Sequence, residues 1–95
     1  MSITHTPVPG SREGTFDLVI DARRVGYLSY AILDDGIMVV DYVEVNPELR
    51  GKSHGEALVG AAVEWARASG RKVRPLCSYA RAVMHRKAAW HDLLS

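Results

Sequence analysis

The sequence contains very little cysteine: one residue, Cys77, among 95. A single thiol cannot form a disulfide within the chain, and it cannot build a metal cluster from cysteines alone. Such scarcity is typical of proteins in a reducing compartment. Residues 1–15 also lack the apolar run that a secretion signal requires. We therefore expect a cytoplasmic protein with no bound metal.

The sequence also lacks a large excess of charge of either sign, and it lacks long hydrophobic stretches. The formal net charge is +1 and no block of like charges marks a basic tail, so we expect no nucleic-acid partner. No apolar stretch is long enough to cross a bilayer, so we expect no membrane partner either. The apolar share of 47% and the charged share of 24% are ordinary for a globular chain.

Turn-forming residues dominate the start of the chain. Residues 1–14 contain two prolines and two glycines and no sustained apolar pattern, which predicts a flexible N-terminal lead-in. Residues 15–95 contain no linker, repeat or low-complexity tract. A chain of this size supports one small core, so we expect a single compact domain over residues 15–95.

The first half of that domain has the pattern of an antiparallel β-meander. Its apolar residues alternate with polar ones or form short runs, as in strands. Between the second and third strands, Asp34, Asp35 and Gly36 favour a hairpin turn, because Gly accepts a positive φ. The third strand is almost wholly apolar, which is typical of a central position in a sheet. The three strands are expected over residues 16–22, 25–33 and 37–45.

The apolar period then changes from that of a strand to that of a helix. Apolar residues recur at helical spacing from Ala57 to Ala66, and Gly70 predicts the end of the helix. A short strand follows and should lie parallel to the third strand, because a helix connects the two. The fold class is therefore α/β with a mixed, mostly antiparallel sheet. The last elements are expected as a strand over 72–77, a helix over 79–89 and an apolar clasp over 90–94.

The junction between the third strand and the helix is the most informative part of the sequence. The apolar strand stops at Asn46-Pro47, and a loop rich in Gly and cations leads into the helix. The first amides of a helix have no partner inside it. Together with the helix dipole, they make the start of a helix a site for an anion such as phosphate.

Two kinds of protein other than the one favoured below could contain this loop. A Walker A motif would need Gly in place of Asn46, and no apolar strand ending in Asp follows to hold Mg²⁺. A zinc deaminase would use His54 and Glu56 as its H-x-E pair, but it also needs two cysteines, and the chain has one. The first reading is disfavoured and the second is excluded.

Residues 50–55, Arg-Gly-Lys-Ser-His-Gly, resemble the R/Q-x-x-G-x-G/A motif of the GCN5-related N-acetyltransferases, with Ser53 where the family usually has Gly. Downstream, the Pro75-x-Cys77-x-Tyr79 segment is similar to that of a compact, YjdJ-type subgroup of the same superfamily. The resemblance spans about residues 16–94. It implies a minimal form of that fold, binding of acetyl-coenzyme A, and transfer of the acetyl group to an amine.

The resemblance also implies a set of site residues. The backbone of Val43 and Val45 would hold the pantetheine arm of the coenzyme, beyond the carboxyl ends of the strands where open α/β sheets bind ligands. Each cation of the loop could instead be a solvated residue. The residues implied to hold the pyrophosphate are Arg50, Gly51, Lys52, Ser53, His54, Gly55 and Glu56.

Three residues are candidates for the reaction itself. Cys77 would lie near the thioester as nucleophile or proton-transfer group, although a lone Cys at a strand end is commonly a core residue. Tyr79 could protonate the departing thiolate, or it could only pack. Glu44 could deprotonate the amine, directly or through water, or it could be a solvated carboxylate.

A function without turnover stays open at this stage. Larger relatives place two helices between their first and second strands, and these help to shape the acceptor site. Here only Arg23, Arg24 and a turn separate the first two expected strands. The alternative is therefore a coenzyme A-binding module that acts through a protein partner. The amine acceptor is not identified by the sequence, and we expect a monomer or a weak homodimer.

Overall fold

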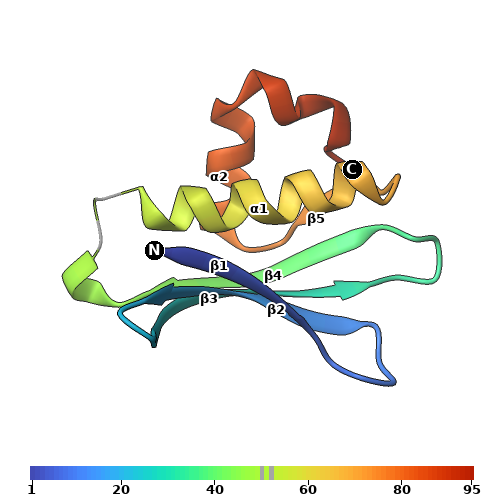
Figure 1. The fold of residues 1–95 in the computed structure, drawn as a ribbon. Helices are drawn as coiled ribbons and strands as arrows, with labels where there is room; N and C mark the ends of the chain where they lie inside the picture. Colours follow the sequence, from blue (N-terminus) through green and yellow to red (C-terminus); the bar gives the residue numbers. More distant parts are fainter. Residues whose placement is uncertain (50, 52) are drawn as a thin grey trace.

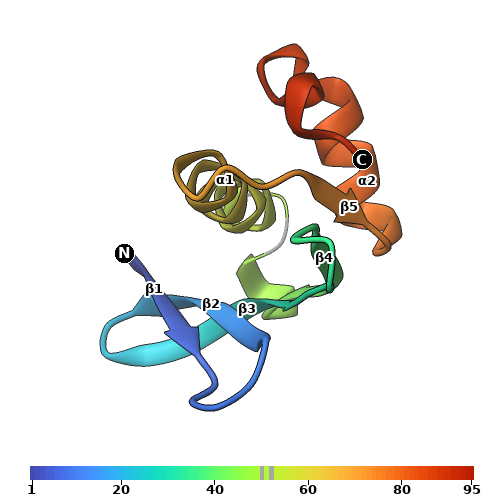
Figure 2. The same ribbon diagram turned by 90° about the vertical axis from the view of Figure 1, so that its right-hand side faces the viewer.

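The computed structural model describes residues 1–49, 51 and 53–95, and it has a twisted five-stranded sheet with α1 lying across one face (Figures 1 and 2). The strand order is β1-β2-β3-β4-β5; the first three pairings are antiparallel and β4–β5 is parallel. The predicted α/β class with a mixed sheet is confirmed. The strands are β1 (Ser2–Pro7), β2 (Glu13–Ile20), β3 (Arg23–Ile32), β4 (Met38–Val45) and β5 (Val73–Pro75), and the helices are α1 (His54–Ala68) and α2 (Ser78–Arg86).

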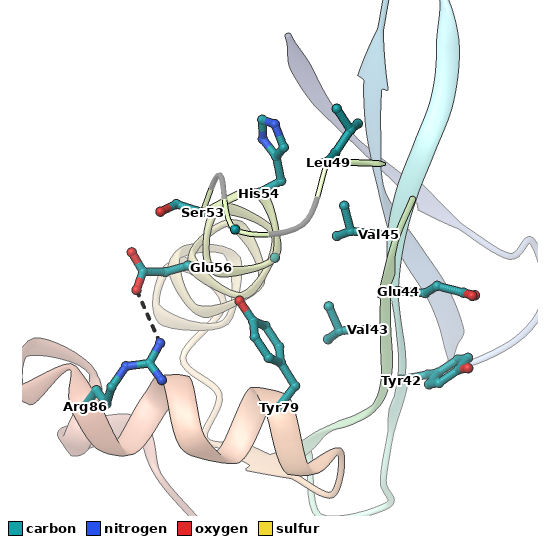
Figure 3. Close-up of a pocket in the computed structure, with 12 residues that line it drawn as sticks. Tyr42, Val43, Glu44, Val45, Leu49, Ser53, His54, Glu56, Tyr79 and Arg86 are labelled. Atoms are coloured by element: carbon teal, nitrogen blue, oxygen red, sulfur yellow. Dashed lines mark ion pairs between the residues drawn. The ribbon is translucent and has the colours of Figure 1, made fainter. Parts of the chain in front are cut away.

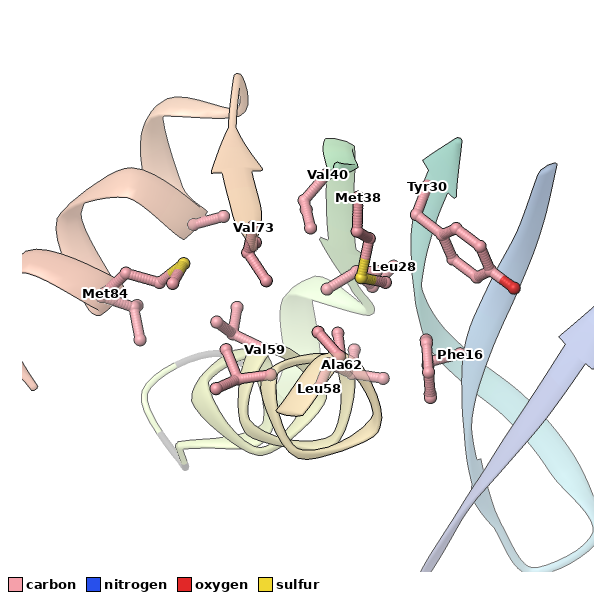
Figure 4. Close-up of a cluster of buried hydrophobic side chains, with 14 of the residues drawn as sticks. Phe16, Leu28, Tyr30, Met38, Val40, Leu58, Val59, Ala62, Val73 and Met84 are labelled. Atoms are coloured by element: carbon pink, nitrogen blue, oxygen red, sulfur yellow. The ribbon is translucent and has the colours of Figure 1, made fainter. Parts of the chain in front are cut away.

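One apolar core lies between the sheet and the two helices (Figure 4). The inward side chains of β2, β3 and β4 meet the apolar side of α1, and α2 extends the core next to β5. Ala62 and Ala66 are buried where α1 faces the sheet, so the helix packs close to the strands. In the described ranges, no helix is both long and apolar enough to span a membrane.

The end of α1 follows the sequence prediction closely. Gly70 adopts φ 71°, a left-handed conformation that Gly accepts without strain. The Gly70 amide donates to the carbonyl of Arg67 at 3.2 Å, and the Arg71 amide donates to the carbonyl of Ala66 at 2.8 Å. These two bonds form a Schellman motif, which satisfies carbonyls that the end of the helix leaves open. The chain then turns back into β5.

The start of the chain corrects the sequence prediction. Residues 2–7 were expected to belong to a flexible lead-in, but they form β1 and pair with β2 from Ser2↔Val19 to Pro7↔Gly14. The Pro and Gly residues that suggested flexibility lie at and beyond the end of β1, where Gly10 has φ 75°. The prediction of a flexible segment is therefore wrong for residues 2–7. The strand gives no clear apolar pattern in the sequence, because only two of its side chains, Ile3 and His5, are partly buried, and one of them is polar.

The C-terminal segment forms the expected clasp. α2 ends at Arg86, earlier than predicted, and a short 3-10 segment (Ala88–Leu93) follows. Leu93 is buried, and Leu94 forms an isolated bridge with Val73 of β5. The end of the chain therefore covers the outer edge of the last strand.

A β-bulge in β4 sets the direction of its side chains. Ser29 pairs with Tyr42 while Tyr30 pairs with Val40, so Asp41 is the extra residue on β4. Before the bulge, Val40 faces the core, and after it Val43 and Val45 do so. A bulge of this kind increases the local twist and re-aims the strand. The last part of β4 is thereby turned toward the start of α1.

His5 joins β1 to an aromatic group in the core. Its ring stacks on Phe16 with centroids 4.3 Å apart, and its Nε2 lies 2.6 Å from the hydroxyl of Tyr30. Trp65 of α1 meets the same ring edge-on at 4.9 Å. Burial lowers the pKa of His5 below its ordinary value of 6.5, because the charged form is disfavoured away from water.

We predict that His5 makes the folded state less stable in mild acid. The pKa of His5 is lower in the folded than in the unfolded chain, so the unfolded state takes up the proton first and stability falls as pH drops below about 6.5. His5→Phe keeps a ring on Phe16 but carries no titrating group. Its midpoint of unfolding in urea should change less between pH 8 and pH 5.5 than that of the wild type. If the urea midpoint changes equally with pH in the two proteins, His5 does not have this role.

Candidate active site

A cleft of about 640 Å³ opens between the end of β4, the start of α1 and α2 (Figure 3). It exists because β5 pairs only with residues 38–40 of β4, so the two parallel strands separate beyond Val40. The amides of Leu76 and Cys77 both donate to the Val40 carbonyl, at 2.9 and 3.2 Å, and hold the point of separation. The lining residues are Tyr42, Val43, Glu44, Val45, Leu49, Gly51, Ser53, His54, Gly55, Glu56, Tyr79 and Arg86.

The β4 wall of the cleft offers free backbone groups. The Asn46 amide donates to the Val25 carbonyl at 2.8 Å, and Glu44 lies opposite Tyr27 in the same register. Hydrogen-bonding pairs alternate along an antiparallel ladder, so the N–H and C=O groups of Val43 and Val45 point away from β3. No strand in the described part of the chain lies opposite them, because β5 ends at Pro75. A ligand with amide groups can pair there as an added strand would.

The start of α1 offers a second set of free groups. The first bond of the helix runs from the Ala57 amide to the Ser53 carbonyl at 3.1 Å. The amides of His54, Gly55 and Glu56 therefore have no partner within the helix, and the Ser53 side chain does not cap them. With the positive end of the helix dipole, these amides suit an anion.

Ser53 reaches this position in a left-handed conformation, with φ 61° and ψ 17°. Gly adopts this conformation freely, whereas a residue with a Cβ is strained by roughly 1–2 kcal/mol. Gly51 is also left-handed, at φ 82°. Ser53 is the position where the loop departs from the motif that it resembles, and its left-handed conformation is the physical reason why Gly is the easier residue there.

Tyr79 lies over the first turn of α1. A Cβ at Gly55 would be 2.7 Å from the Tyr79 hydroxyl oxygen and 2.9 Å from ring carbons, so only Gly allows this contact. Desolvation raises the pKa of Tyr79, an effect that nearby Arg86 partly offsets. The hydroxyl therefore keeps its proton at neutral pH and can donate it within the cleft.

Three lining residues were missed by the sequence analysis: Tyr42, Leu49 and Arg86. Arg86 and its neighbour Lys87 form ion pairs with Glu56, at 3.8 and 3.5 Å. Basic residues at the C-terminal end of a helix are common because they interact favourably with the helix dipole. The sequence around Arg86 and Lys87 therefore does not indicate that they pair with Glu56. Only the packing of α2 beside α1 brings this pair to Glu56, and Arg86 to the cleft.

The other predicted residues divide into three groups. Arg50 and Lys52 lie outside the described residues. Cys77 is partly buried and packs against the core, and its side chain is not among those that line the cleft. Glu44 contributes backbone to the cleft, but its carboxylate points to the opposite face of β4 (Figure 3). There Glu44 lies opposite Tyr27 in the β3–β4 register, and the pKa of Tyr27 is raised by burial and by the charge of Glu44.

A family model described as GCN5-related N-acetyltransferase matches residues 15–93. The match covers most of the sequence, so the chain belongs to the GCN5-related N-acetyltransferase family. This confirms the resemblance seen in the loop and the strands around it. The YjdJ-type subgroup stays a prediction. No curated protein matches the sequence.

Solved structures share the fold at low sequence identity. A GCN5-like N-acetyltransferase candidate from Staphylococcus aureus has a TM-score of 0.71 at 22% identity, over 99% of this chain and 87% of its own. The IAA acetyltransferase from Bacillus cereus has a TM-score of 0.72 at 18% identity, over 90% and 73%. A streptothricin acetyltransferase candidate from Bacillus anthracis, solved with acetyl-coenzyme A, has a TM-score of 0.62 at 12% identity, over 70% and 39%. The chain thus spans well under half of that last protein.

We predict that Ser53→Gly raises the stability of the protein. The change removes the strain of a left-handed residue with a Cβ, so the free energy of unfolding should rise by about 0.5–1 kcal/mol. Chemical denaturation measures it. Ser53→Ala is the matched control, because it removes the hydroxyl but keeps the Cβ, and it should give no gain. A gain in both variants, or in neither, would contradict the assignment of strain to this conformation.

Proposed function

We propose that the chain is an N-acetyltransferase that uses acetyl-coenzyme A to acetylate an amine. The observation that supports this is the meeting, in one cleft, of unpaired β4 backbone groups and the open amides of α1. A ligand that fits both carries amides along an extended arm and a phosphate group at the end of that arm. Coenzyme A has these two features, in its pantetheine arm and its pyrophosphate.

Each part of the cleft has a proposed role in binding. The backbone of Val43 and Val45 pairs with the pantetheine amides, and the segment from Ser53 to Glu56 holds the pyrophosphate through its amides. Gly51 also lines the cleft, and because it has no side chain it leaves the backbone there accessible to the ligand. Arg50 and Lys52, outside the described residues, keep the phosphate-neutralising role that the family resemblance gives them.

The reacting groups are proposed from the same geometry. Acetyl-coenzyme A supplies an activated acyl group as a thioester. Tyr79, protonated in the cleft, donates a proton to the leaving thiolate. The backbone of Cys77 is fixed at the point where β4 and β5 separate. We propose that its thiol acts near the thioester, as nucleophile or in proton transfer.

The amine is proposed to approach from the face of β4 opposite α1. Glu44 presents its carboxylate there and can take a proton from the amine, directly or through water. The β2–β3 connection is only the two residues Asp21 and Ala22, both with positive φ, so no helix is inserted at this point. The acceptor side is therefore shallow. The alternative function is a coenzyme A-binding module without turnover, and an assay of acetyl transfer distinguishes it from an enzyme.

The first test is binding. Coenzyme A titrated into the protein should give a saturable heat, and Gly55→Asp should weaken the affinity by more than about tenfold. The new carboxylate repels phosphate at the start of α1, and its Cβ displaces Tyr79. Gly10→Asp is the control: it adds the same side chain in the β1–β2 turn, where a Cβ meets nothing within 4 Å. The φ of 75° at Gly10 makes the substitution costly for stability, but coenzyme A should bind as to the wild type. No saturable heat from the wild type would overturn the proposed function.

The second test is transfer. Tyr79→Phe should lower the rate of acetyl transfer to a panel of primary amines by about 10²-fold while coenzyme A binds as before, because the proton donor is lost. Cys77→Ala should also lower transfer without affecting binding. Intact mass spectrometry after incubation with acetyl-coenzyme A shows whether an acetyl group is carried on Cys77. Unchanged turnover in Cys77→Ala would leave that residue with a packing role alone. Binding without any transfer in the wild type would favour the non-catalytic module.

A further inference from the structure

Two cations at the end of α2 lie beside the first turn of α1. The Arg86 guanidinium is 3.8 Å from one carboxylate oxygen of Glu56, and the Lys87 ammonium is 3.5 Å from the other. Both distances are longer than a good charge-assisted hydrogen bond. The two cationic side chains are also 61% and 44% exposed. Ion pairs of this kind add little to stability, so a helix-to-helix tie is a weak explanation for them.

The groups along the cleft follow one order in space (Figure 3). Val43 and Val45 form the β4 wall, Ser53 marks the start of α1, and Glu56 with Arg86 lies on the side of that turn away from β4. Coenzyme A carries its groups in the same order: the pantetheine arm, the pyrophosphate, and then a ribose with a 3′-phosphate. A ligand seated with its first two groups as proposed brings its third group toward the cations.

We propose that Arg86 and Lys87 bind the 3′-phosphate and so select coenzyme A over its 3′-dephosphorylated form. This inference rests on the proposed function above. The two cations face one carboxylate, so the three side chains carry a formal net charge of +1; Arg86 and Glu56 line the cleft, and Lys87 is the next residue along the chain. A phosphate monoester carries close to two negative charges at neutral pH, and the planar fork of an Arg side chain matches its oxygens.

The test compares coenzyme A with 3′-dephospho-coenzyme A in calorimetric titrations of the full chain. The wild type should bind coenzyme A about tenfold or more tightly, as expected for a charge-assisted contact. Combining Arg86→Gln with Lys87→Gln should bring the ratio of affinities close to one by weakening coenzyme A alone. Arg12→Gln is the matched control, because Arg12 has the same 61% exposure and an ion pair with Asp34, and neither residue lines the cleft.

Each outcome decides a different point. Equal affinity of the wild type for the two ligands would overturn this inference and leave the proposed function standing. A preference that survives in the double variant would also overturn it, because other residues would then contact the 3′-phosphate. If neither ligand binds the wild type, the proposed function and this inference fall together. A preference lost in the double variant and kept in Arg12→Gln supports the subsite.

Discussion

The candidate site depends on the separation of β4 from β5 beyond Val40. On one side of β4, the Val40 carbonyl accepts from the amides of Leu76 and Cys77, which turns the chain out of the β5 ladder. On the other side, the bulge at Asp41 turns the rest of β4 toward α1. The strand then continues for several residues with one edge unpaired. An unpaired edge on an ordinary surface can pair with another chain and cause aggregation. Here the edge forms one wall of the cleft, and α1 lies beside it.

The loop and the first turn of α1 meet two different requirements with small residues. Gly51 and Ser53 are both left-handed, so at these positions the backbone conformation is what matters. Gly55 is helical, and there the requirement is space, because the Tyr79 ring occupies the place of a Cβ. Strain of the kind held at Ser53 persists where the surrounding structure determines it, often at functional sites. The same short segment therefore leaves amides free at the start of α1 and allows the Tyr79 ring to lie over Gly55.

The parts of the fold that the sequence predicted are those with a local cause. The end of α1 at Gly70 was visible because a left-handed Gly after an apolar period is a strong stop signal. The loop at residues 50–55 was visible because Gly and cations between a strand and a helix suit an anion. β1 was missed because its support is pairing with β2 and the contacts of His5 with core aromatic rings, and no periodicity within residues 2–7 reports either. Arg86 was missed for a similar reason, since its place at the cleft comes from the packing of α2 beside α1.

The alternation of side chains along β4 gives its two faces different chemistry. Val43 and Val45 direct their side chains toward α1, while Glu44 between them directs its carboxylate to the other face. On that face the Tyr27 and Tyr42 rings meet edge-on at 5.9 Å, and Tyr27 lies opposite Glu44 on the neighbouring strand. Under the proposed function, one strand would hold a thioester-bearing arm by its backbone and present a base to an amine from the opposite side. Because the β2–β3 connection is a two-residue turn, no helix from that connection covers this face, and recognition of the proposed amine would fall on the sheet itself.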